Sequence, residues 1–460
     1  MSIKTLFYMM LFQAMAFLVV ACKGPIEVPV EEGKVPVLKS CTIEADSYVS
    51  KTTDRVTLTF SAPINLVDGS KISLVDNLNN KLQITNTVAN LNINIRFDNK
   101  LEPNRKYTLS VGSGTVKAIQ GGKENTSYSL VFHTEKELIP VDKFDIDPNL
   151  ITPNPSSEAK ALYDYLKEGF GKRSLSGSMA KYTVQLNEAQ WMKEKTGKYP
   201  AIACFDLMNA GRGYNWDEPY TTMITNAKEW HSNKGIVSIM WHWRDPSRKT
   251  EAFYSMKTNN DPRTGFDVSK VHDTSSEEYK AMVEDIDYIA SFLKELADAG
   301  IPVLWRPLHE AQGGWFWWGA KEGKDAVALW NLLYDRLVNH HGLNNLIWVW
   351  TITNNDGAED WYPGRDKVDI VGADVYRDHT NHASYKDYFD FVASVSEGHK
   401  LVALSECGAV PSVENMLAKG DTWLYFMPWY GDFTQDDKHN GAGFMKTLFD
   451  SDFVITRDEL

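Results

Sequence analysis

The sequence predicts a (β/α)8 barrel, an α/β fold, preceded by a small all-β sandwich. Between residues 156 and 460, short apolar runs alternate eight times with amphipathic helical segments, as in parallel strands covered by helices. Between residues 36 and 136, apolar and polar residues alternate with a period of two, which is typical of antiparallel strands. An open doubly wound sheet is the alternative for the larger segment. It normally has a glycine-rich phosphate loop after its first strand, and the sequence has none there.

Composition narrows the possible partners. The chain has 460 residues, 43% of them hydrophobic, and a net charge of -13, so we expect no nucleic-acid partner. A neutral substrate fits this charge better. The four cysteines, at positions 22, 41, 204 and 407, have neither zinc-type spacing nor the close pairs of a disulfide framework. Cys204 and Cys407 lie in apolar runs and are predicted to be buried thiols.

The N-terminus predicts a targeting segment. Residues 1–21 begin with Lys4, continue through an apolar stretch and end in small residues, as a secretory signal does. A transmembrane helix is the alternative, but the run is short and interrupted by Gln13. The sequence Val-Val-Ala-Cys, which ends at Cys22, resembles the bacterial lipobox, in which this cysteine becomes lipidated. Residues 22–35 are rich in Pro and Glu and are predicted to form a tether. We therefore expect a lipoprotein of a bacterial cell envelope, attached to the membrane through Cys22.

Residues 36–136 are predicted to form the sandwich. The motif Thr-Phe-Ser-x-Pro at 59–63 and the ending Phe-His-Thr at 132–134 resemble bacterial immunoglobulin-like domains. Because no aromatic cluster marks the ends of the predicted strands, a spacer role is favoured over carbohydrate binding. The strands are expected at 55–60, 92–97, 106–111 and 128–132.

Residues 137–155 contain four prolines and are predicted to be a linker, after which residues 156–460 form the barrel. A helix is predicted from 276 to 298, because its apolar residues share one stripe and Ser275 and Glu278 have capping-box spacing. The eight strands are expected near 174–178, 201–207, 236–243, 302–309, 346–351, 369–376, 400–408 and 423–429.

Two of the predicted strands end in a glutamate. Glu310 follows the run Val-Leu-Trp-Arg-Pro-Leu-His, and Glu406 follows Leu-Val-Ala-Leu-Ser. They are three strand–helix units apart, which places them almost across the mouth of an eight-stranded ring, at the end where barrel enzymes bind substrates. Hydrolysis of a glycosidic bond needs two such carboxyl groups, one to protonate the leaving oxygen and one to attack or to activate water. The aromatic run from Trp315 to Trp318 could supply the apolar wall that keeps the acid protonated.

Plainer interpretations remain open from the residues alone. A glutamate at a strand end is often paired with a nearby arginine, and His242 and His309 could be ordinary core histidines. Trp317 and Trp318 could serve packing only. A metal site is not predicted, because the chain has no His-Glu-x-x-His spacing.

The pair His309-Glu310, followed by Trp-Phe-Trp-Trp-Gly at 315–319, resembles glycoside hydrolase family 26 over essentially all of 156–460. The family consists of retaining barrel enzymes with the acid/base on strand four and the nucleophile on strand seven. The resemblance implies that Glu310 is the acid/base and Glu406 the nucleophile. It also implies further residues that bind the substrate or orient the carboxylates: Arg306, His242, His309, Trp315, Tyr376 and Trp429. Trp423 is an alternative to Trp429.

The resemblance also implies a substrate class. The family is dominated by β-mannanases acting on β-1,4-linked mannans, while some members cleave β-1,3-xylan or mixed-linkage β-glucan. We therefore expect an endo-acting hydrolase of mannan, glucomannan or galactomannan that needs no cofactor and works as a monomer. A non-catalytic glycan-binding lipoprotein is the alternative from another class, and the presence of both Glu310 and Glu406 argues against it.

Overall fold

The computed structural model describes residues 35–460, with gaps at 78–79, 104, 136–139, 182–184, 209, 211–217, 354–356 and 378–380 and without the side chains of 218–220. The chain divides into two compact units, Met1–Glu135 and Lys136–Leu460. The tether and Cys22 lie outside the described residues. Among the residues described, no helix is long and apolar enough to cross a membrane.

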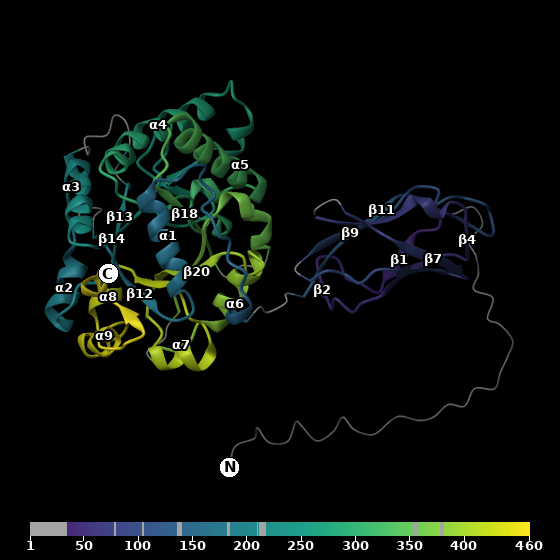
Figure 1. Ribbon diagram of the computed structural model, residues 1–460. Coiled ribbons are helices and arrows are strands. Elements are labelled where there is room, and N and C mark those ends of the chain that lie inside the picture. Colours follow the sequence, from purple (N-terminus) through teal and green to yellow (C-terminus); the bar gives the residue numbers. More distant parts are fainter. Residues whose placement is uncertain are drawn as a thin grey trace, which may run out of the picture. The chain divides into compact units, whose positions relative to one another are not determined.

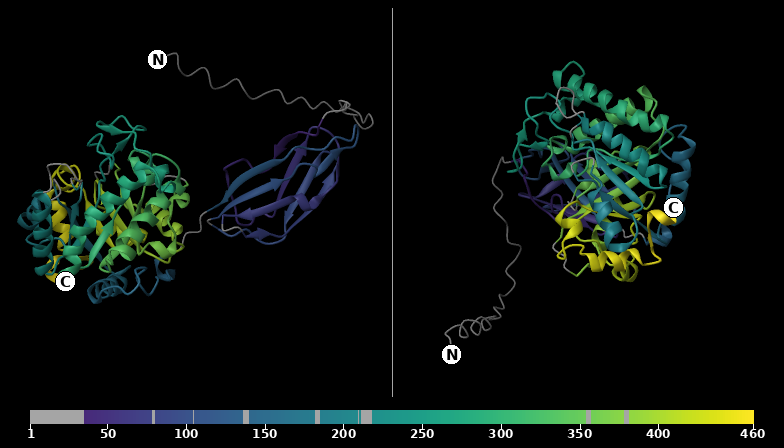
Figure 2. Two further views of the ribbon diagram at one scale, coloured as in Figure 1. Left: turned by 90° about the horizontal axis from the view of Figure 1, so that it is seen from above. Right: turned by 90° about the vertical axis from the view of Figure 1, so that its left-hand side faces the viewer.

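The first unit is the predicted β-sandwich. A four-stranded sheet in the order β1-β3-β8-β7 faces a five-stranded sheet in the order β2-β11-β9-β5-β6 (Figure 2). Leu58, Ile93, Leu109 and Phe132 alternate with outward residues and are fully buried between the sheets, which explains the period of two. The strands are β1 (Leu38–Cys41), β2 (Tyr48–Val49), β3 (Arg55–Phe60), β4 (Ile64–Leu66), β5 (Ile72–Asp76), β6 (Lys81–Leu82), β7 (Ile84–Ala89), β8 (Asn92–Phe97), β9 (Lys106–Val111), β10 (Val116–Ala118) and β11 (Tyr128–Thr134).

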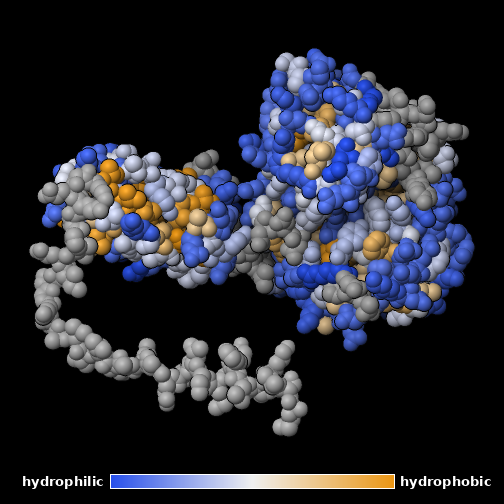
Figure 3. Space-filling view, turned by 180° about the vertical axis from the view of Figure 1, so that it is seen from behind, coloured by the Kyte–Doolittle hydropathy of each residue, from blue (hydrophilic) through white to orange (hydrophobic). Residues whose placement is uncertain are grey.

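On one face of the molecule, the surface of this unit is more apolar than that of the barrel (Figure 3). On the face in Figure 3, apolar side chains gather on the sandwich, while the barrel surface is mainly hydrophilic. Among the described residues of the sandwich, the large apolar side chains exposed to solvent include one aromatic residue, Tyr48; the others are Val37, Leu66, Val67 and Ile119. One tyrosine does not make an aromatic platform for sugars.

The second unit is the predicted (β/α)8 barrel. Eight parallel strands follow one another around a closed ring, because β12 pairs with both β13 and β21, and helices surround them (Figure 1). Their side chains are buried along the whole strand, as expected for strands covered on both faces. The ring consists of β12 (Ser174–Met179), β13 (Ile202–Asp206), β14 (Ile236–Met240), β17 (Val303–Arg306), β18 (Leu346–Ile352), β19 (Ile370–Val375), β20 (Leu401–Cys407) and β21 (Tyr425–Pro428).

Helices fill the connections, with one short β-ribbon after the third barrel strand. The long helix α4 begins one residue later than predicted: Ser276, not Ser275, is its N-cap and accepts a hydrogen bond from the backbone of Tyr279. The hydroxyl of Ser275 instead donates a hydrogen bond to the carboxylate of Asp273. The helices are α1 (Ser157–Gly169), α2 (Asn187–Thr196), α3 (Glu218–Ser232), α4 (Glu277–Asp298), α5 (Gly323–Tyr334), α6 (Lys386–Val395), α7 (Val413–Lys419), α8 (Asp432–Gln435) and α9 (Ala442–Phe449), and the remaining strands are β15 (Tyr254–Ser255), β16 (Arg263–Thr264) and β22 (Val454–Ile455).

The fourth barrel strand is shorter than predicted. β17 ends at Arg306, whereas the sequence predicts a strand as far as residue 309. Leu308 and Glu310 both have positive φ values, 51° and 53°, so the backbone leaves the strand direction and turns before the glutamate. Glu310 therefore lies in a turn beyond the strand, just before the short 3-10 helix η4 (Ala311–Gly313).

Residues 145–151 pack against the N-terminal ends of the barrel strands. The Asp147 carboxylate forms ion pairs with Lys400 and Arg365, and its backbone accepts a hydrogen bond from the hydroxyl of Tyr163. The buried Asp369 accepts from the backbone of Ile151 at 2.8 Å. This part of the proline-rich segment is therefore fixed to the barrel.

Candidate active site

Glu406 is the second-last residue of β20, and its carboxylate accepts hydrogen bonds from two sides. Only 4% of the residue is exposed. The guanidinium of Arg306 donates to Oε1, and the hydroxyl of Tyr376 donates to Oε2 at 2.7 Å. Desolvation around the hydroxyl and the charge of the neighbouring Glu406 raise the pKa of Tyr376, so the tyrosine keeps the proton that it donates. The sequence-predicted pairing of a strand-end glutamate with an arginine is thus present here, in a position that also fixes the carboxylate in the mouth of the barrel.

Glu310 has a different environment. It is 9% exposed, and its Oε2 accepts a hydrogen bond of 2.8 Å from the indole of Trp315. Burial, together with the charge of Glu406, raises the pKa of Glu310 to about 7, although Trp315 and Arg306 oppose the shift. This carboxyl group can therefore hold a proton near neutral pH, as an acid catalyst must.

The two glutamates lie close together. An oxygen of Glu310, one of Glu406 and one of Asp374 are all within 4.8 Å of one another. Asp374 is a site residue that the sequence interpretation missed. It accepts from Arg306 at 3.0 Å and from the hydroxyl of Ser405 at 2.9 Å, and it lies near the end of β19, two residues before Tyr376. Its position two residues before the predicted site residue Tyr376 is the sequence feature that could have identified it.

His242 and His309 lie side by side, with ring centroids 4.5 Å apart. Burial lowers the pKa of His309 well below its usual range, so its ring is neutral. The Nδ1 atom of His309 has no partner among the described residues, which is unusual for a buried polar atom. His242 is held by the carboxylate of Asp206, a second residue that the sequence interpretation missed.

The aromatic residues divide into lining and packing groups. Tyr376 is 45% exposed, and Trp315 and Trp429 are partly buried, so all three can meet a ligand. Trp423 is fully buried against Phe389, which removes it as an alternative stacking platform.

Trp317 and Trp318 are also fully buried. Their indoles donate to the backbone carbonyls of Trp243 and His309, at 2.6 Å and 2.9 Å. Of the predicted wall, only Trp315 contacts the carboxyl of Glu310. Trp318 holds the backbone just before Glu310, whereas Trp317 bonds to the segment that follows β14.

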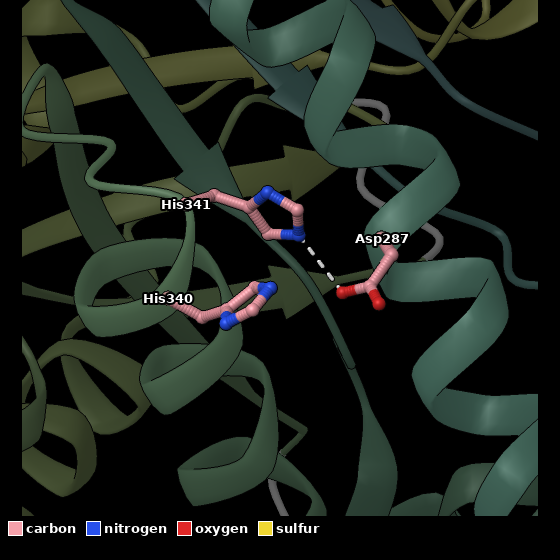
Figure 4. Close-up of side chains that lie close together, drawn as sticks. All are labelled: Asp287, His340 and His341. Atoms are coloured by element: carbon pink, nitrogen blue, oxygen red, sulfur yellow. Dashed lines mark hydrogen bonds and ion pairs between the residues drawn. The ribbon is translucent and has the colours of Figure 1, made fainter.

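Two clusters among the described residues contain enough oxygen or nitrogen ligands for a metal ion. In each cluster, an arginine binds the carboxylates and so disfavours a metal cation. In the mouth of the barrel, Arg306 binds the carboxylates of Asp374 and Glu406. On the outside, Asp287 of α4 faces His341, with His340 beside it (Figure 4).

Both oxygens of Asp287 accept hydrogen bonds from Arg336, at 2.7 and 2.6 Å, and Oδ1 also contacts Nε2 of His341 at 2.8 Å. A guanidinium on both carboxylate oxygens repels a cation and occupies its ligands. The residues therefore fit ion-pair networks better than metal centres.

Comparison with known proteins agrees with this geometry. Residues 151–459 match glycosyl hydrolase family 26, and residues 33–134 match a bacterial Ig-like domain. A mannan endo-1,4-beta-mannosidase of Thermothelomyces thermophilus is 37% identical over 368 residues, which cover 78% of this chain and 72% of the relative. Mannan endo-1,4-beta-mannosidase B of a Piromyces species is 35% identical over 324 residues, 68% of this chain and 54% of that protein.

Among solved structures, a beta-mannanase from a symbiotic protist of the termite Reticulitermes speratus, in complex with gluco-manno-oligosaccharide, is similar with a TM-score of 0.65. The two are 39% identical, and the match covers 69% of this chain and 98% of the other. The family match spans about two thirds of the sequence and contains both glutamates of the site. The chain belongs to glycosyl hydrolase family 26.

Proposed function

We propose that this family 26 enzyme is a retaining, endo-acting hydrolase of β-1,4-mannosidic bonds in mannan, glucomannan or galactomannan. One observation carries the mechanism: carboxylate oxygens of Glu310 and Glu406 lie within 4.8 Å of each other at the mouth of the barrel. Retaining glycosidases keep their two carboxyl groups about 5–5.5 Å apart, whereas inverting enzymes need about 6.5–9.5 Å to admit a water. The names of the relatives support mannan as the substrate.

In the first step, an oxygen of Glu406 attacks the anomeric carbon and the bond to the leaving sugar breaks. Glu310 gives its proton to the leaving oxygen. Because Oε2 of Glu310 accepts the Trp315 indole proton, Oε1 is the oxygen that carries the transferable proton. Arg306 and Tyr376 hold Glu406 in position for this attack.

In the second step, the now ionised Glu310 takes a proton from water, the water oxygen bonds to the anomeric carbon, and Glu406 leaves as a carboxylate. Two inversions at one carbon give net retention. His242, His309, Trp315, Tyr376 and Trp429 bind the sugar in the cleft. The neutral ring of His309 adds no positive charge that would weaken the proton affinity of Glu310.

Product analysis tests this proposal. Purified protein is incubated with mannan, glucomannan, mixed-linkage β-glucan and β-1,3-xylan, and the products are sized while NMR follows the anomeric configuration. Internal cleavage of the β-1,4-mannans with a β-configured first product is expected. Cleavage of only β-1,3-xylan or mixed-linkage glucan would contradict the mannan assignment, and binding without new reducing ends would point to a glycan-binding protein.

Glu406→Ala and Glu310→Ala supply the residue-level test. Removing the nucleophile should lower kcat by roughly five orders of magnitude, in the range seen when a covalent catalyst is lost. Ser384→Ala, which removes a hydroxyl bound to Asp421 outside the site, is a control for folding. Turnover unchanged in Glu406→Ala would reject that residue as the nucleophile.

The location proposed for the enzyme is the bacterial envelope, with Cys22 as a lipidated first residue and the sandwich as a spacer. The lipobox-like ending of the apolar N-terminal segment supports this assignment. Expression of the full chain in a bacterium should place it in the membrane fraction, and Cys22→Ala should release it into the soluble fraction. Equal membrane retention of both proteins would argue against lipidation.

We also propose that the enzyme is a monomer. The purified full chain in detergent is expected to form a single species at the monomer mass.

A further inference from the structure

The buried carboxylate of Asp206 binds His242 in two places. Its Oδ2 lies 2.6 Å from Nδ1 of the His242 ring, and its Oδ1 accepts from the His242 backbone at 3.0 Å. We propose that Asp206 is a positioning residue for the reaction. It holds His242 in the tautomer with a proton on Nδ1, so that Nε2 faces the substrate as a hydrogen-bond acceptor. This inference rests on the proposed function and assigns a role within the same site.

The strand register explains why this contact forms. Asp206 is the last residue of β13 and is paired with Met240, the last residue of β14. His242 lies two residues beyond the end of β14, where its backbone and its ring both contact Asp206. The carboxylate at the end of one strand thus reaches both the backbone and the ring beyond the end of the next.

The ring of His242 has little freedom to turn. It packs against Phe253, Phe316 and Trp429, with centroid distances of 5.0, 5.4 and 5.9 Å, and against His309 at 4.5 Å. Flipping the ring would break the contact between Nδ1 and a carboxylate that is only 4% exposed. Leaving such a buried acceptor unpaired is costly.

The protonation pattern follows from the chemistry of the partners. An ionised carboxylate can only accept hydrogen bonds, so Nδ1 must be the donor. In a neutral imidazole the other nitrogen is then an acceptor. Nε2 of His242 makes no hydrogen bond with any residue that the structure describes, so it is available to a sugar hydroxyl.

The position of His242 makes this choice matter for the reaction. A positive charge on His242 lowers the pKa of Glu310, which shows that the ring lies within electrostatic reach of the acid. Among the described residues, the ionisable side chains in contact with the ring are Asp206 and His309, and burial keeps the latter neutral. The orientation of the His242 ring is thus set by the carboxylate behind it.

The first test reads the tautomer directly. The full chain is labelled with ¹⁵N-histidine, and the His242 signals are identified among the 11 histidines by their absence in His242→Gln. A protonated Nδ1 and an unprotonated Nε2 are expected in the unmodified protein without substrate. A proton on Nε2 alone would overturn the proposal. No substrate is needed, so this result is separate from the success or failure of the proposed mannanase activity.

The second test measures coupling between the two residues. Asp206→Asn keeps the shape of the side chain but can present a donor to Nδ1, and kcat/KM on mannan should fall about 10- to 100-fold, as for other residues that orient a ligand group. In a His242→Ala background the same change should cost almost nothing further. Independent, multiplying losses would contradict the inference.

The matched control is Asp245→Asn. Asp245 is also buried and lies three residues after His242, beyond the end of β14. Its carboxylate accepts hydrogen bonds from Ser247 and Thr264 rather than from a histidine. It should lower the melting temperature and leave the ¹⁵N signals of His242 unchanged. If Asp206→Asn does not fold, the tautomer in the unmodified protein still decides the question.

Discussion

At the scale of single residues, the two carboxyl groups are distinguished by the donors around them. Glu406 receives one cationic donor and one hydroxyl donor, from Arg306 and Tyr376. Glu310 receives a single neutral donor, from Trp315, and otherwise lies in a buried setting that raises its pKa. Environments that separate two neighbouring carboxyl groups in this way assign one of them to acid catalysis.

The first prediction concerns the pH dependence of turnover. The first step requires a protonated Glu310 in the free enzyme, so kcat/KM should fall as the pH rises through about 7. Trp315→Phe removes a hydrogen bond that lowers the pKa of Glu310, and the alkaline limb of the kcat/KM profile should therefore move to higher pH by roughly 0.5 to 1 unit. Trp423→Phe is the control, because that buried indole donates to Asp421, outside the site. A downward shift in Trp315→Phe would reject the assignment.

The second prediction concerns stability. The pKa of Glu310 is about 7 in the folded protein against an ordinary value of 4.5, so between these values the folded state binds the proton more tightly than the unfolded chain. The free energy of unfolding must then fall as the pH rises through this window. Glu310→Gln cannot lose that proton and should gain stability relative to the unmodified protein between pH 5 and pH 8 in urea titrations.

Glu277→Gln is the control for this comparison, because Glu277 is an exposed residue at the start of α4. Its stability should follow that of the unmodified protein at both pH values. A stability difference between Glu310→Gln and the unmodified protein that does not change with pH would show that burial does not raise the proton affinity of Glu310.

At the scale of elements, the strands were predictable and the turn that carries the acid was not. Near-continuous apolar runs identify all eight barrel strands, because a strand covered on both faces has no polar side. The position of Glu310 depends on positive φ values at Leu308 and Glu310, which neither residue favours by itself. Packing of the following tryptophans determines this turn.

Asp206 and Asp374 were missed because their partners come from other strands and are distant in sequence.

A third prediction tests the packing of this turn. Gly319 lies so close to the Ala311 carbonyl that a Cβ atom would come within 1.8 Å of its oxygen. Gly319→Ala must push the two segments apart and should lower the free energy of unfolding by about 1–3 kcal/mol. It should also reduce kcat, because the contact between Trp318 and the His309 carbonyl is displaced. Gly443→Ala, with open space around it in α9, should cost no stability, and equal effects of the two changes would contradict this account.

At the scale of the whole molecule, opposite ends of the barrel have different tasks. The C-terminal ends of the strands hold the catalytic carboxyl groups, while Asp147, Asp369 and Lys400 join the N-terminal ends to the segment before α1. The Lys400 side chain is only 1% exposed, and its ammonium group pairs with the carboxylate of Asp147 at 2.7 Å. Arg365 and Lys400 hold the pKa of Asp147 below its usual range despite burial.

The fourth prediction follows from that ion pair. Asp147→Asn leaves the buried ammonium of Lys400 without its counter-charge and should lower the free energy of unfolding by about 3 kcal/mol. Asp142→Asn breaks only an exposed pair with Lys143 and should change it by less than about 0.5 kcal/mol. Chemical denaturation followed by tryptophan fluorescence measures both. Similar, small effects would show that Lys400 is satisfied by other groups.

The last prediction concerns the independence of the two units. The core of the sandwich and the core of the barrel are separate clusters with no residue in common. Each has the closed hydrophobic interior that a domain needs in order to fold alone. Deleting residues 1–135 should therefore leave kcat/KM on soluble mannan within about twofold of the full chain. Calorimetry of the full chain should show two transitions, of which the shortened protein keeps one unchanged. A large loss of activity or a lower melting temperature of the remaining transition would instead give the sandwich a part in supporting the barrel.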